Sequence, residues 1–118
     1  MADTRSPWIA LGALNAAIAV GAGAFAAHGL RERLDARALE VFETGARYQM
    51  YHALAMVLCG LLVMTKPGWT FQAGIALFSG SLYALALTDV KVLGAITPFG
   101  GLAFLAGWIW LAISALRA

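Results

Sequence analysis

The sequence predicts an all-α integral membrane protein in which four transmembrane helices form an antiparallel up-down bundle. Composition is the first reason: 62% of the 118 residues are hydrophobic and 12% are charged, whereas a soluble domain carries about 25% charged residues. Mean hydropathy is correspondingly high, at +0.80. The second reason is that the charged side chains fall outside four long apolar runs: Trp8–Leu30, Tyr48–Met64, Trp69–Leu87 and Ile96–Leu116. Each run approaches or exceeds the roughly 17–25 residues that a helix needs to cross hydrocarbon, and helices satisfy their own backbone in lipid.

The first run has one competing interpretation, a cleaved signal peptide. Ala24-Phe25-Ala26 resembles a cleavage site. However, Asp3 offsets Arg5 before the run, and the run is long for the apolar region of a signal peptide. We therefore expect a retained membrane helix. Four such helices use most of the chain, so residues 1–118 are expected to form one domain.

Small residues recur along the first run. Two series have a spacing of four residues: Ala13, Ala17 and Gly21, and Gly23 and Ala27. Small residues at this spacing let helix backbones approach closely in lipid, where packing drives association. We expect these five residues to pack against a helix, either in the same chain or in a second one.

The charged segment between the first two runs predicts an amphipathic helix at the membrane interface. Asp35 is a plausible N-cap for the helix formers that follow it, and the apolar side chains of the segment share one side of a helical wheel. The later connections are short, at Lys66-Pro67-Gly68 and Asp89–Lys91. Short connections favour antiparallel neighbours in a bundle.

Basic residues are unequally divided between the two ends of the expected bundle. One end carries Arg31, Arg33, Arg37, Arg47 and Lys91, and the other carries Arg5, Lys66 and Arg117. By the positive-inside rule, residues 31–47 and 88–95 are expected in the cytoplasm and both termini outside.

Polar side chains from separate runs should meet near one end of the bundle. The candidate polar cluster is His28, Tyr48, Gln49, His52, Ser79, Ser81, Tyr83, Thr88, Asp89 and Thr97. Polar groups are costly to desolvate in lipid, so they should face the bundle interior or water. This cluster is where a functional site is expected.

Several uses are open for His28 and His52. They can fix helix packing through hydrogen bonds, or bind a ligand or carry protons, since histidine titrates near neutral pH. Haem ligation needs opposed imidazoles, which the spacing does not demand, and zinc needs further ligands, for which Asp89 is the nearby candidate. We predict no metal and no cofactor. No Ser, Cys or Thr has a base-and-orienter arrangement, and no nucleic-acid signature is present, so we expect neither an enzyme nor a nucleic-acid binder.

Four segments together resemble a known family. They are Gly23–Leu30, Phe42–Leu54, Leu77–Tyr83 and Gly94–Gly101. In that order they resemble the DUF423 family of small membrane proteins, which is similar to the transmembrane protein 256 group. The resemblance implies a bacterial inner-membrane protein with about four helices, and it implies no established activity.

The expected function is therefore that of a non-enzymatic assembly or accessory component of the inner membrane. Such a protein contacts the lipid bilayer and forms a homo-oligomer or joins a larger membrane complex. One alternative is a small transporter or channel component that binds a polar solute or proton at His28, Gln49 and His52. A haem- or metal-binding protein is a further alternative.

Overall fold

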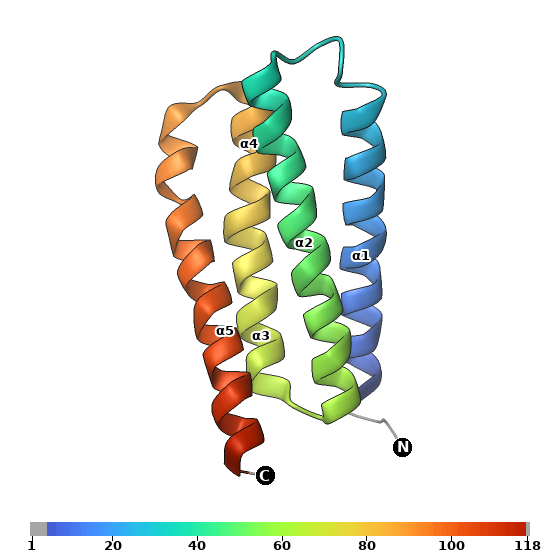
Figure 1. The fold of residues 1–118 in the computed structure, drawn as a ribbon, viewed down its shortest axis with the longest axis vertical. Helices are drawn as coiled ribbons and strands as arrows, with labels where there is room; N and C mark the ends of the chain where they lie inside the picture. Colours follow the sequence, from blue (N-terminus) through green and yellow to red (C-terminus); the bar gives the residue numbers. More distant parts are fainter. Residues whose placement is uncertain (1–4, 118) are drawn as a thin grey trace.

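The computed structural model describes residues 5–117, and that range is built of helices and short connections. In chain order the elements are α1 (Arg5–Ala27), α2 (Ala36–Leu62), α3 (Thr65–Gly74), the π-helix η1 (Ile75–Ser79), α4 (Gly80–Thr88), the 3-10 helix η2 (Lys91–Ala95) and α5 (Thr97–Arg117). α3, η1 and α4 follow one another without a break and form one rod. α2 lies between α1 and this rod, and α5 lies on the rod's other side (Figure 1). The connections before α2 and after α4 lie at one end of the molecule, here called the loop end (upper in Figure 1).

Three helical stretches of the described residues are long and apolar enough to cross a membrane. They are Pro7–Ala27, Thr65–Thr88 and Lys91–Arg117, of 21, 24 and 27 residues. These stretches correspond to the first, third and fourth predicted runs. α2 is equally long at 27 residues, but its first half carries Arg37, Glu40, Glu43 and Arg47. Length and composition therefore support three crossings and leave the fourth, through α2, as a separate question.

The expected interfacial helix before the second run is a part of α2. Asp35 caps α2 as predicted, since its Oδ1 accepts a hydrogen bond from the backbone N–H of Ala38 at 2.8 Å. The helix then continues through Gly45 to Leu62 without interruption. Gly45 is buried, and a Cβ added there would lie 3.0 Å from the ring of Tyr83. Gly45 thus admits a neighbouring aromatic ring while α2 stays continuous.

α1 packs on α2 through a set of small residues different from the predicted one. A Cβ added to Gly12 would lie 2.7 Å from the carbonyl oxygen of Ala53, so the two backbones meet there. Ala19 and Ala26 are buried on the same side of α1. Ala13, Ala17 and Gly21 are exposed, because a rotation of about 100° per residue puts them on the opposite side. Of the two other predicted packing residues, Gly23 is half-buried and Ala27 is exposed.

α5 meets the α3–η1–α4 rod by pairing glycines with phenylalanines. Gly74 lies against the ring of Phe104, and Gly107 lies against the ring of Phe71. A Cβ added to Gly100 would collide with the backbone nitrogen of Phe78, which leaves no room for any side chain. Phe71 and Phe104 are both buried. Phenylalanines of α5 therefore fill the gaps left by glycines of the α3–η1–α4 rod, and phenylalanines of the rod fill the gaps left by glycines of α5. This brings the middle of α5 close to α2.

Candidate functional site

The middle of the molecule contains a chain of hydrogen-bonded side chains that joins four helices. Tyr83 of α4 donates to Oε1 of Gln49 at 2.7 Å, and Nε2 of Gln49 donates to Oδ1 of Asn15 at 3.0 Å. Nδ2 of Asn15 in turn donates to Oε1 of Gln72 at 3.0 Å. These four residues, Tyr83, Gln49, Asn15 and Gln72, are called the interior polar chain below. It connects α4, α2, α1 and α3 in that order.

Every side-chain nitrogen and oxygen at the centre of the interior polar chain has a hydrogen-bond partner. Asn15 and Gln49 are 7% and 4% exposed, and each uses both its amide nitrogen and its amide oxygen. Within the part of the chain that the structure describes, every buried side-chain nitrogen or oxygen has a hydrogen-bond partner. An unpaired amide in hydrocarbon is costly, whereas a bonded one links helices. The interior polar chain therefore cross-links the helices.

His52 lies one turn beyond Gln49 in α2 and is held on three sides. Trp108 of α5 donates its indole N–H to Nε2 of His52 at 3.0 Å, and Nδ1 lies 2.6 Å from the backbone oxygen of Tyr48. Because Nε2 accepts and Nδ1 donates, the ring is the neutral tautomer with its proton on Nδ1. The imidazole also stacks on Phe104, with ring centroids 3.5 Å apart and planes at 5°. Nε2 of His52 thus ties α5 to α2, and the bond of Nδ1 to Tyr48 in the same helix fixes the orientation of the ring.

The predicted serines and threonine of the third and fourth runs form two further ties. Ser79 donates to the backbone oxygen of Gly45 at 2.7 Å and so joins η1 to α2. The hydroxyls of Ser81 and Thr97 lie 2.6 Å apart and join α4 to the start of α5. Ser81 also donates to the backbone oxygen of Phe78. Ser79 is the last residue of the π-helix η1, which interrupts the rod as a π-bulge interrupts an α-helix.

Tyr48 belongs to an aromatic group and not to the interior polar chain. It is 37% exposed, and its ring centroid lies 4.9 Å from that of Phe78 and 5.4 Å from that of Tyr51. Through its backbone oxygen it holds His52. Tyr48 therefore covers the contact between α2 and α5 from outside.

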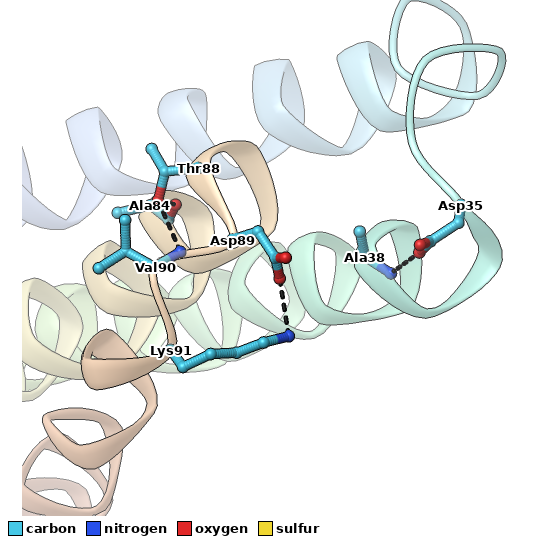
Figure 2. Close-up of polar contacts among 7 residues, drawn as sticks. All are labelled: Asp35, Ala38, Ala84, Thr88, Asp89, Val90 and Lys91. Atoms are coloured by element: carbon cyan, nitrogen blue, oxygen red, sulfur yellow. Dashed lines mark hydrogen bonds and ion pairs between the residues drawn. The ribbon is translucent and has the colours of Figure 1, made fainter.

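The remaining predicted residues lie at the loop end, away from the interior. His28 is exposed in the turn after α1, and its side chain makes no hydrogen bond with another described residue. Thr88 donates to the backbone oxygen of Ala84 at 2.6 Å, and Asp89 pairs with Lys91 at 2.8 Å (Figure 2). Because His28 follows Asn15 by thirteen positions, it lies about 20 Å further along the helix axis. The structure does not bring His28 next to Gln49 and His52.

His28 lies apart from Gln49 and His52 because α2 runs without a break from Ala36 to Leu62. Prediction placed Gln49 and His52 at the start of a span, next to the loop that holds His28. Since α2 begins at Ala36, both residues lie near its middle. The predicted cluster is therefore divided into an interior set and an exposed set, and no three His, Cys, Asp or Glu side chains of the described residues lie close enough together to hold a metal ion.

Three residues of the site were outside the predicted cluster. Asn15 and Gln72 complete the interior polar chain, and Trp108 donates to His52. Asn15 and Gln72 had a usable signal, because an amide inside an apolar span is expected to face a neighbouring helix. Trp108 had none, since a tryptophan near the end of a span is also typical of the membrane interface.

The fold and its interior define a class, that of small helical integral membrane proteins whose helices are joined by buried hydrogen bonds. Within that class the chain belongs to the family described as "Protein of unknown function (DUF423)", whose model matches residues 22–101. This confirms the resemblance drawn from the sequence.

Bacterial relatives that match over most of the chain are named as membrane proteins. The UPF0382 membrane protein YwdK of Bacillus subtilis is 48% identical, covering 93% of this chain and 96% of its own. A UPF0382 membrane protein of Staphylococcus epidermidis is 49% identical over 93% of this chain and 95% of its own. No solved structure gives a significant match. The chain is therefore a small membrane protein of a family without an assigned activity.

If the interior polar chain stabilises the protein, Tyr83→Phe should lower the free energy of unfolding by about 0.6–1.7 kcal/mol, the range for hydrogen bonds between membrane helices. The substitution removes the hydroxyl that donates to Gln49 and keeps the ring. Tyr51→Phe is the matched control, because Tyr51 is 52% exposed. Unfolding in mixed micelles measures both variants, and equal stabilities would contradict the assignment.

Proposed function

We propose that the protein is a non-enzymatic four-helix membrane protein that acts by assembling with copies of itself or with a larger complex. The observation that carries this proposal is that each buried side-chain nitrogen or oxygen of the described residues already has a hydrogen-bond partner within the chain. Asn15, Gln49 and His52 hydrogen-bond to other side chains or backbone atoms of the same chain. Groups used in this way hold helices together, and recognition then falls to the outer surface.

The outer face of α1 supports assembly. Ala13, Ala17 and Gly21 are exposed on one side of the helix, and a Cβ added to Gly21 would meet no atom within 4 Å. The close contact of α1 with α2 uses Gly12 on the other side. A face of small residues admits a second helix at short distance. This outer face is proposed to receive a helix of a second protein molecule.

Assembly can be tested by enlarging one residue of that face. Ala17→Leu should shift the protein from an oligomer or complex to a monomer in native nanodiscs, while unfolding stability stays unchanged because Ala17 is exposed. Ile18→Leu, at a position that is 57% exposed, is the control. Mass photometry or native mass spectrometry gives the size. A wild-type protein that is monomeric when extracted with its native lipid contradicts the proposal.

A transporter or channel component is the competing function, and His52 distinguishes the two. On our proposal His52→Ala should reduce the amount of folded protein, because it leaves the Trp108 N–H unpaired at a cost of about 1–3 kcal/mol. Proteoliposomes of the wild type should leak protons no faster than empty liposomes. Proton or solute flux that the wild type supports and folded His52→Ala lacks would replace the assembly proposal by the transport one.

We further propose that α2 crosses the membrane as a fourth span, which makes the bundle antiparallel. α2 runs beside the stretches that are long and apolar enough to cross (Figure 1). Its charged first half is at the loop end, and its second half, from Tyr48 to Leu62, contains no charged residue. Arg31, Arg33, Arg37 and Lys91 lie at the loop end, against Arg5, Lys66 and Arg117 toward the other end, so the loop end is proposed to be cytoplasmic.

Cysteine labelling tests both the number of crossings and the orientation. Glu32→Cys and Thr65→Cys stand at exposed positions on either side of α2, in a chain whose own Cys59 is buried. In intact cells a membrane-impermeant maleimide should label Thr65→Cys and Leu116→Cys, and should label Glu32→Cys only after permeabilisation. Equal access to Glu32→Cys and Thr65→Cys would show that α2 does not cross.

A further inference from the structure

A groove at the loop end has a charged rim and an apolar floor. It lies between the first turns of α2 and the end of α4, with a volume of about 490 Å³. Arg33, Arg37 and Lys91 supply positive charge at the rim, whereas Leu34, Val41 and Leu85 line it with carbon. Figure 2 shows the two sides of the groove, with Asp35 at the start of α2 and Asp89 and Lys91 after α4.

The acidic residues of this groove are already engaged. Asp35 accepts the N–H of Ala38 as the cap of α2, at 2.8 Å, and Asp89 pairs with Lys91 at 2.8 Å (Figure 2). Arg33 and Arg37 are exposed and make no side-chain hydrogen bond or ion pair with another described residue. The two arginines therefore have no hydrogen-bonded or ion-paired partner among the described residues, and together with Lys91 they outnumber the two carboxylates that line the groove, Asp35 and Asp89.

The position of the groove matches that of lipid head groups. Thr88 ends one stretch that is able to cross a membrane, and Lys91 begins the next. Leu87, which lines the groove, and Val90, which lies between the groove residues Asp89 and Lys91 in the sequence, are about half-exposed, at 52% and 48%. An amphiphile bound here can place an anionic group on the rim while its acyl chains lie along the apolar helix surfaces below.

We propose that this groove binds the phosphate of an acidic phospholipid. The guanidinium groups of Arg33 and Arg37 suit phosphate, because each presents several N–H donors in a planar fork. Lys91 joins them by exchanging Asp89 for the phosphate, and its pair with Asp89 is weak enough to exchange, since both side chains are at least 80% exposed. The shared chemistry is a phosphate-bearing anion, and the lipid source is favoured by the apolar floor.

Lipid titration of the purified full chain tests this proposal. Native mass spectrometry in detergent should show tighter binding of phosphatidylglycerol than of phosphatidylcholine. Replacing both arginines, as Arg33→Gln with Arg37→Gln, should weaken phosphatidylglycerol binding about fivefold per residue, the usual contribution of a basic residue at an anionic surface. Arg31→Gln is the matched control, because Arg31 is exposed in the same loop but does not line the groove.

Three results would overturn the proposal. The first is an equal loss of binding in Arg31→Gln, which would mean that only general surface charge attracts the lipid. The second is equal affinity for the two lipids. The third is stabilisation by inorganic phosphate, at constant ionic strength, that matches the stabilisation by phosphatidylglycerol, since it would assign the groove to a soluble anion. If the double variant fails to fold, the wild type decides: its affinity for phosphatidylglycerol must fall as salt rises, and a salt-independent affinity refutes binding through these charges.

Discussion

Desolvation of the Gln49 amide is the constraint on which the arrangement of the helices depends. An amide buried among apolar helices must find partners for both its oxygen and its nitrogen. Gln49 finds Tyr83 on one side and Asn15 on the other, and Asn15 then reaches Gln72. Apolar side chains can slide past one another at little cost, whereas these bonds require one register of α1, α2 and the α3–η1–α4 rod. The hydrogen bonds therefore select the register, and the glycines at the helix contacts permit the short distances.

His52 fixes the position of α5 in the same way, through a hydrogen bond between side chains of two helices. Its Nε2 atom accepts from Trp108, and its ring stacks on Phe104, which also fills the space beside Gly74. A protonated imidazole would lose the bond from the Trp108 N–H, because Nε2 would then carry a hydrogen itself. Holding α5 and carrying a proton on Nε2 are thus incompatible states of this side chain. This conflict is the physical reason for favouring a structural role.

The sequence predicted the helices well because lipid leaves few choices for the backbone. Long apolar runs must be helical, and the capping role of Asp35 follows from local chemistry. The start of α2 at Asp35 was therefore predicted, but the place of its charged first turns beside the other helices was not, since a charged amphipathic segment looks the same as a surface helix and as the first turns of a longer one. The facing side of α1 was within reach of prediction. Asn15 marks the inward side of α1, and Gly12, Ala19 and Ala26 lie three, four and eleven positions from it on that side. The more regularly spaced Ala13, Ala17 and Gly21 lie on the outward side. The π-helix and the role of Trp108 depend on contacts between residues far apart in the sequence, so no local sequence pattern predicts them.

The polar residues of the interior and those of the surface thus differ in whether they are free to bind another molecule. Side chains in the middle of the bundle are bonded to one another and hold the register of the helices. At the loop end, Asp35 and Asp89 are bonded within the chain, but Arg33 and Arg37 present donors that no described residue accepts. Charges of this kind are tolerated where they meet water or anionic head groups and are costly in hydrocarbon. If α2 crosses the membrane, the positive charge at its start also opposes translocation of that end. The same arginines would then orient the protein during insertion and bind the acidic lipid after it, so that the orientation and the lipid site depend on one set of charges.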